Sequence, residues 1–282
     1  MSIRFFVPIM AVSAVLCLSA CGDKKGESKS GSGKVSEHYN KGNDLVLMDK
    51  LEEAEKEYLA CIREDSNDWR AFYQLGGLYQ LRGDFRAAMY SFNRSVEINP
   101  EFTLGFFNKA NLEEMVGDEK ASKRDLDRVL TLKKDFFMAY MARARKASGG
   151  GNFKEAVYYF DSAIKLRPDF YLAYSMRGSC KYRMGDFEGA VKDFSDEIEL
   201  FPGHLMGFVN RAMAYGEMKN YRAAISDLSQ AIQIDPMWSQ SFIYRGVFYH
   251  KLNVKDSGCG DFRMAFKLKN PQAEAFSKEY CK

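Results

Sequence analysis

The order of apolar and polar positions divides the chain of 282 residues into three parts. An uncharged, mostly apolar run extends from Phe5 to Ala20, behind the single positive residue Arg4. Residues 22–34 then carry Gly, Ser, Lys and acidic side chains without one large apolar side chain. From residue 35 onward, one pattern of apolar, small and polar positions repeats. The pattern predicts an apolar leader, a polar linker and a repetitive folded part.

The leader over residues 1–20 has the layout of a signal peptide. Its uncharged run is shorter than the roughly 18 to 20 apolar residues of a spanning helix, and Pro8 interrupts it. No positive stop-transfer cluster follows directly. A removed leader is therefore favoured over a retained transmembrane helix.

Leu18-Ser19-Ala20-Cys21 resembles the bacterial lipobox, in which a branched apolar residue and two small residues precede a cysteine. The resemblance implies that Cys21 is lipidated, that cleavage occurs before it and that the new amino group is acylated. Two or three chains hold a protein stably on a membrane. The expected location is the periplasmic face of a bacterial envelope. Gly22 is not the aspartate that retains some lipoproteins at the inner membrane, so an outer membrane is favoured. The alternative is ordinary secretory cleavage of an unanchored protein.

The linker over residues 21–34 cannot bury enough apolar surface to offset the entropy of ordering, so we expect a flexible tether. A random coil of this length spans about 20 Å. Its GSGK end is not a phosphate-binding loop, because Ser28 and Val35 stand where the motif needs Gly and Ser or Thr.

The repeated pattern has a period of 34 residues. For example, GNFKEAVYYFDSAIKLRPDF at 151–170 aligns with GDFEGAVKDFSDEIELFPGH at 185–204. Positions are numbered here from the first residue of each repeat. Seven repeats fit without insertion or deletion: 35–68, 69–102, 103–136, 137–170, 171–204, 205–238 and 239–272.

This period resembles the tetratricopeptide repeat (TPR) family, whose unit is two antiparallel helices. Position 8 is small so that the two helices can cross closely, and position 24 is the large side chain between them. Proline at position 32 ends the second helix in four repeats. The resemblance implies an all-α, right-handed solenoid of seven helix-turn-helix units with a capping helix over residues 273–282. The signature residues in the second repeat are Phe72, Leu75, Gly76, Tyr79, Ala88, Phe92 and Pro100.

Position 7 is basic in six repeats, and position 23 is acidic in five of those six. Repeat 2 loses both charges together, with Leu75 and Ser91, and repeat 4 has Arg143 with Tyr159. Joint loss is expected of paired residues, so we predict a partly buried ion pair between the two helices of a repeat. A catalytic row of charges is the less favoured alternative. The pairs are Lys41–Glu57, Lys109–Asp125, Arg177–Asp193, Arg211–Asp227 and Arg245–Asp261.

Little of the chain is left for catalysis outside the repeats. Once the leader, linker and repeats are assigned, only residues 273–282 remain, so an active site would have to be built on the repeats. The three histidines share no spacing that suits a metal site, and no GxSxG or HExxH motif occurs. A formal charge of +3, spread through the chain, disfavours nucleic-acid binding. We expect no enzyme activity, cofactor, metal or small-molecule substrate.

Cys259 and Cys281 lie at equal distances from residue 270, where the chain turns between two antiparallel helices. Oxidation is possible outside the cytoplasm, so we predict a disulfide that holds the capping helix, worth roughly 3 kcal/mol. The alternative is two free thiols. Cys61 and Cys180 are expected to be small packing residues.

In TPR proteins the first helices line a concave groove, to which positions 2, 5, 9, 12 and 13 usually point. A chaperone-type carboxylate clamp is not expected, because Tyr39 replaces its lysine. For any one groove residue, and particularly at position 5, packing between neighbouring first helices is an equally favoured interpretation. The resemblance places the following residues in the groove: Leu104, Phe107, Asn111, Met115, Met138, Met141, Leu172, Met206, Val209 and Met213.

Together these features predict a non-catalytic scaffold or assembly adaptor in the bacterial cell envelope. It would bind an apolar helix or extended peptide of another envelope protein in the groove, and the membrane through Cys21. The alternatives are a secreted, unanchored TPR protein and, less favoured, an enzyme built on the groove.

Overall fold

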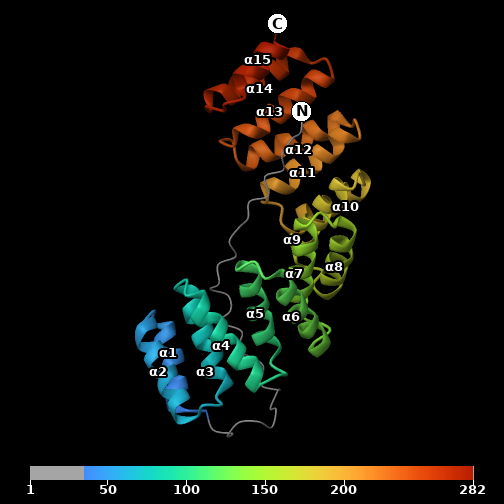
Figure 1. Cartoon of the computed structure of the whole chain (residues 1–282). Coiled ribbons are helices and arrows are strands. Elements are labelled where there is room, and N and C mark those ends of the chain that lie inside the picture. The colour runs from blue at the N-terminus through green and yellow to red at the C-terminus, as the bar shows by residue number, and fades with distance from the viewer. Residues whose placement is uncertain (1–34, 282) are drawn as a thin grey trace. The chain divides into compact units, whose positions relative to one another are not determined.

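The computed structural model describes residues 35–281, which form fifteen α-helices and no strands (Figure 1). The first fourteen helices form seven successive pairs, and the fifteenth follows the last pair. The predicted all-α repeat fold is confirmed. The helices are α1 Glu37–Leu47, α2 Leu51–Glu64, α3 Trp69–Leu81, α4 Phe85–Ile98, α5 Thr103–Met115, α6 Glu119–Leu132, α7 Phe137–Gly149, α8 Phe153–Leu166, α9 Tyr171–Arg183, α10 Phe187–Leu200, α11 Leu205–Glu217, α12 Tyr221–Ile234, α13 Ser239–Lys251, α14 Lys255–Lys267 and α15 Ala273–Tyr280.

The turn inside each pair has the same backbone geometry in all seven repeats. Position 15 adopts a positive φ each time, and glycine fills it in four repeats because it has no Cβ to clash there. The next residue donates its backbone N–H to the carbonyl of position 11, as Asp84 does to Tyr79 at 2.9 Å. Asp84 also caps α4 through its side chain, which accepts from the N–H of Ala87.

The core of each pair is built where position 8 meets position 24. A Cβ added to Gly76 would lie 2.6 Å from the ring of Phe92, so any side chain at Gly76 would force the ring to move. Gly178 and Phe194 repeat the arrangement, with 2.9 Å to the ring. The predicted small-to-large contact is confirmed, since position 24 is at most 1% exposed in every repeat: Tyr58, Phe92, Leu126, Phe160, Phe194, Leu228 and Phe262.

The structure consists of two compact parts, which are described separately. The N-terminal part is residues 35–134, with α1 to α6, and the C-terminal part is residues 135–281, with α7 to α15. In the C-terminal part, α15 covers the last pair of helices, with Phe276 and Tyr280 packed on the buried Phe262. The prediction of a capping helix is confirmed.

Candidate functional site

Four of the ten predicted groove residues are buried. Phe107, Met141 and Val209 at position 5 are only 5%, 6% and 2% exposed, and Met213 at position 9 is 6% exposed. Met141 lies in the core around α7 and α8, and Val209 and Met213 lie in the core around α11 and α12. This burial favours packing inside the protein over contact with a partner, and the role of these four residues in partner binding stays a prediction.

The other six predicted groove residues reach the surface. Met115 and Met138 are 59% and 44% exposed, and the other four are partly buried. Their role in partner binding stays a prediction. Leu104, Asn111 and Met115 lie on α5 in the N-terminal part, whereas Met138, Leu172 and Met206 occupy position 2 of α7, α9 and α11 in the C-terminal part.

The first helices of the N-terminal part are joined to one another by side-chain amides. Gln74 on α3 donates to the Asn43 side chain on α1 at 3.2 Å, and Tyr58 donates to the same oxygen at 2.7 Å. Asn108 on α5 donates to the Tyr73 hydroxyl at 2.7 Å. These links were not predicted from the sequence, although Gln74 and Asn108 both carry an amide at position 6 of their repeats.

The five predicted ion pairs between positions 7 and 23 are all present. Each lysine uses its single ammonium: Lys41 lies 2.7 Å from Glu57, and Lys109 lies 2.6 Å from Asp125. Each arginine instead binds both carboxylate oxygens of its aspartate. Arg177, Arg211 and Arg245 do so at distances of 2.7–2.9 Å.

The two exceptions to this pairing also fit the structure. Arg143 donates to the Tyr159 hydroxyl at 2.6 Å and lies over its ring, so an aromatic acceptor replaces the carboxylate. In repeat 2, Leu75 and Ser91 are both buried and neither carries a charge. The residues at positions 7 and 23 thus serve to hold the two helices of a repeat together.

Two buried glutamates have no counterpart in the other repeats. Glu113 on α5 is 4% exposed and shares the ammonium of Lys109 with Asp125. Burial raises the pKa of Glu113, because removing a carboxylate from water penalises its charged form. One of its oxygens, Oε2, is buried without a hydrogen-bond partner among the described residues.

The second buried carboxylate, Glu197 on α10, is fully buried and lies 2.6 Å from Nδ1 of His204. A Cβ on Gly207 would lie 3.3 Å from its carboxyl carbon, so the absence of a side chain there makes room for the glutamate. The sequence already marked Glu197 as an exception, because position 27 is Cys, Ser, Val or Ala in every other repeat.

The four cysteines within residues 35–281 fall into two classes. Cys259 on α14 and Cys281 after α15 form a disulfide, with their Cα atoms 5.7 Å apart. Cys61 and Cys180 are free and buried. Burial raises the pKa of Cys61 to about 12, so its thiol is not a nucleophile at neutral pH.

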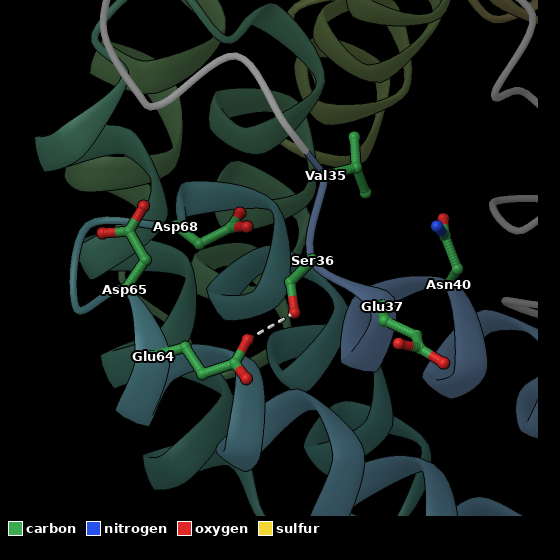
Figure 2. Close-up of a pocket in the computed structure, with 7 residues that line it drawn as sticks. All are labelled: Val35, Ser36, Glu37, Asn40, Glu64, Asp65 and Asp68. Atoms are coloured by element: carbon green, nitrogen blue, oxygen red, sulfur yellow. Dashed lines mark hydrogen bonds between the residues drawn. The ribbon is translucent and has the colours of Figure 1, made fainter.

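A pocket of about 480 Å³ lies where α1 begins and α2 ends (Figure 2). Four carboxylates line it, and Figure 2 shows Ser36 donating to one of them, Glu64, at 2.7 Å. Asp68 is already bound by Arg70 at 3.0 Å. Within residues 35–281, no three His, Cys, Asp or Glu side chains converge as metal ligands. The pocket is acidic, but its side chains are not arranged as a metal-binding site.

The predicted lipidation site, Cys21, lies outside the described residues. Of the helices that the structure describes, none is long and apolar enough to cross a bilayer.

Family models identify the repeats independently. Models described as tetratricopeptide repeat match residues 39–101, 141–204 and 207–236, which together make up more than half of the chain. No curated protein sequence matches the chain.

Solved structures share the fold at low sequence identity. The C-terminal part of a TPR repeat-containing protein from Cytophaga hutchinsonii is 15% identical, with a TM-score of 0.74, over 84% of this chain and 98% of that one. A TPR protein from Parabacteroides merdae is 18% identical, with a TM-score of 0.60, over 87% and 98% of the two chains. YrrB, described as a TPR protein with an unusual peptide-binding site, is 19% identical, with a TM-score of 0.57, over 65% and 95%.

Proposed function

Because this chain belongs to the tetratricopeptide repeat family, we propose that it is a non-catalytic scaffold that binds a segment of a partner protein on its first helices. One observation carries the proposal: Met138, Leu172 and Met206 form an accessible apolar row at position 2 of α7, α9 and α11. Apolar side chains that reach the surface at the same position of successive helices are typical of a surface that buries a partner. Met138, the most exposed of the three, is 44% exposed.

The spacing of this row suits an apolar helix. Neighbouring packed helices lie about 10 Å apart, and seven residues of an α-helix rise about 10.5 Å. A partner helix crossing α7, α9 and α11 would therefore offer one apolar residue per heptad to each contact. An extended peptide would need about three residues for the same distance. Two of the three side chains are methionines, which adapt to differently shaped partners.

The surface of α5 offers a second, separate contact in the N-terminal part. Leu104 and Met115 are apolar and accessible, and the amide of Asn111 can bond a peptide backbone. The peptide-binding site for which YrrB is described supports peptide recognition as a use of this fold.

The test replaces the apolar row with charge in the full chain. Met138→Glu, Leu172→Glu and Met206→Glu, combined in one variant, should abolish capture of the partner by crosslinking in intact cells. Tyr158→Glu with Met237→Glu is the matched control, because these residues are 66% and 72% exposed and lie on α8 and before α13, outside the row. If every partner is still crosslinked to the triple variant, the row is not the binding surface.

The proposal includes a lipid anchor at Cys21 in a bacterial envelope, with the outer membrane favoured where one is present. It is supported by the lipobox-like Leu18-Ser19-Ala20-Cys21 sequence and by the polar linker that follows. Cys21→Ser should release the protein from membranes into the soluble fraction. A variant that stays membrane-bound would contradict the anchor but not the binding row.

Two alternatives remain testable beside this one. A secreted, unanchored TPR protein predicts that Cys21→Ser leaves the distribution unchanged because the wild type is already soluble. An enzyme built on the first helices predicts turnover that the triple glutamate variant abolishes. The described residues give the second alternative little support, because the buried charges at positions 7 and 23 are used in pairs between helices.

A further inference from the structure

The position-7 arginines of the last three repeats each bond to side chains on two neighbouring helices, and so join three helices with their own. Beyond the aspartate of its own repeat, each arginine donates through Nη1 to the side chain at position 25 of the preceding repeat. That side chain lies on the second helix of the preceding pair. The contacts are Arg177 to Asp161 at 2.6 Å, Arg211 to Ser195 at 2.9 Å and Arg245 to Ser229 at 3.0 Å.

The serine acceptors are oriented for this contact by their own hydrogen bonds. Ser195 donates its hydroxyl hydrogen to the Val191 carbonyl at 2.7 Å, and Ser229 donates to Ile225 at 2.7 Å. A hydroxyl has one hydrogen, so the remaining lone pairs of each oxygen face outward as acceptors. Each serine therefore joins its own helix to the arginine of the next pair.

Among the bonds to the preceding repeat, those to Ser195 and Ser229 are partly buried, whereas Asp161 is 55% exposed. The bonds to the aspartates of the same repeat lie largely out of water, where charged hydrogen bonds are strong. The arginine side chains are 14–20% exposed, and their aspartate partners are 0–8% exposed. Lys109 in the N-terminal part differs, because its ammonium contacts Asp125 and Glu113, which both belong to its own repeat.

We propose that these arginines are a coupling device that makes the helix pairs of the C-terminal part open together. In repeat proteins the interface between neighbouring units decides whether they unfold jointly or one at a time. The three arginines join α8 to α9, α10 to α11 and α12 to α13. After the last of these contacts, the disulfide between Cys259 and Cys281 joins α14 to the end of α15.

The test is native-state hydrogen exchange of the full chain, read by mass spectrometry. In the wild type, the slowest amides of α7–α10 and α11–α15 should exchange at one common rate. Arg211→Lys keeps the positive charge beside Asp227 but loses the guanidinium fork, and Ser195→Ala removes only the acceptor on α10. Each should separate the two rates by about fivefold, the value expected for one hydrogen bond of about 1 kcal/mol.

Arg222→Lys is the matched control, because Arg222 is an exposed arginine on α12. It should leave the common rate intact. Coupling is contradicted if α7–α10 and α11–α15 still exchange at equal rates in Ser195→Ala, whether or not both rates have increased. It is also contradicted if these two sets of helices already exchange at different rates in the wild type.

Discussion

The N-terminal and C-terminal parts follow the same 34-residue pattern but are stabilised differently. In the N-terminal part, lysines pair with acids of their own repeat, and Lys41 is 62% exposed. In the last three repeats of the C-terminal part, arginines bind their aspartates through two bonds and add a third to the preceding repeat. In the last three repeats the position-7 arginine thus joins two pairs of helices, whereas Lys109 stabilises one pair.

The two ends of the described chain are also closed in different ways. On α1, Glu37 and Asp44 are exposed at positions 3 and 10, where the second repeat buries Ala71 and Leu78. Polar residues make that first surface compatible with water, as the end of a stack requires. The C-terminal end is instead covered by α15, which Cys281 links covalently to α14.

The largest expected effect comes from stranding a buried aspartate. Arg211→Leu should lower the free energy of unfolding of α11 and α12 by about 3–5 kcal/mol, because Asp227 keeps a buried charge without its partner. Lys41→Leu should cost less than about 1 kcal/mol, because the pair that it breaks is largely exposed on the lysine side. Hydrogen exchange of the affected helices measures both.

The double variant Arg211→Leu with Asp227→Ala separates pairing from packing. It should recover a large part of the lost stability, because no charge is left alone. A double variant as unstable as the single variant would mean that the arginine acts through its packing and not through its charge.

Removing the disulfide should have the next largest effect. Replacing Cys259 and Cys281 with serine should destabilise α14 and α15 by about 3 kcal/mol, because a released helix of eight residues is marginal by itself. Exchange in α1–α6 should not change. Replacing Cys61 and Cys180 with alanine is the control for losing thiols. Equal protection of α15 with and without the disulfide would show that Phe276 and Tyr280 alone hold it.

The repeat pattern was sufficient to predict contacts inside a repeat. Seven copies act as replicates, so the small residue at Gly76 and the large ring at Phe92 could be assigned to one contact. Joint loss of charge at Leu75 and Ser91 likewise identified the ion pairs. These contacts depend on the fixed geometry of one pair of helices, which the period specifies.

Contacts between repeats were harder to predict. Met138 and Met141 lie one turn apart on α7, yet they are 44% and 6% exposed. Which of them faces a neighbouring helix depends on how closely successive pairs pack, and a one-dimensional spacing does not contain that distance. The third arginine bond was missed for the same reason, because its acceptor belongs to the preceding repeat.

Glu113 gives a smaller, pH-dependent test of the N-terminal part. Its folded pKa is raised by burial, so its contribution to stability is present below the unfolded pKa of about 4.3 and is lost as pH rises through the folded pKa. Glu113→Gln has no carboxyl group at this position and avoids this loss. As pH rises from about 4 to about 7, the gap between its free energy of unfolding and that of the wild type should therefore change by about 1 kcal/mol in favour of the variant. Denaturant unfolding across this range measures the gap, with the exposed Glu114→Gln as control. A gap independent of pH would contradict the raised pKa.

The smallest effect comes from giving the N-terminal part an arginine of the C-terminal kind. Lys109→Arg places a guanidinium beside Asp125, and position 25 of the preceding repeat is Asn93, whose amide oxygen can accept the third bond. We expect about 0.5–1 kcal/mol of stabilisation, together with exchange rates in α3–α4 and α5–α6 that move toward each other. Lys109→Arg with Asn93→Leu should keep the bond to Asp125 and lose the convergence of the rates. If both variants couple the pairs equally, the difference between the two parts does not arise from position 25.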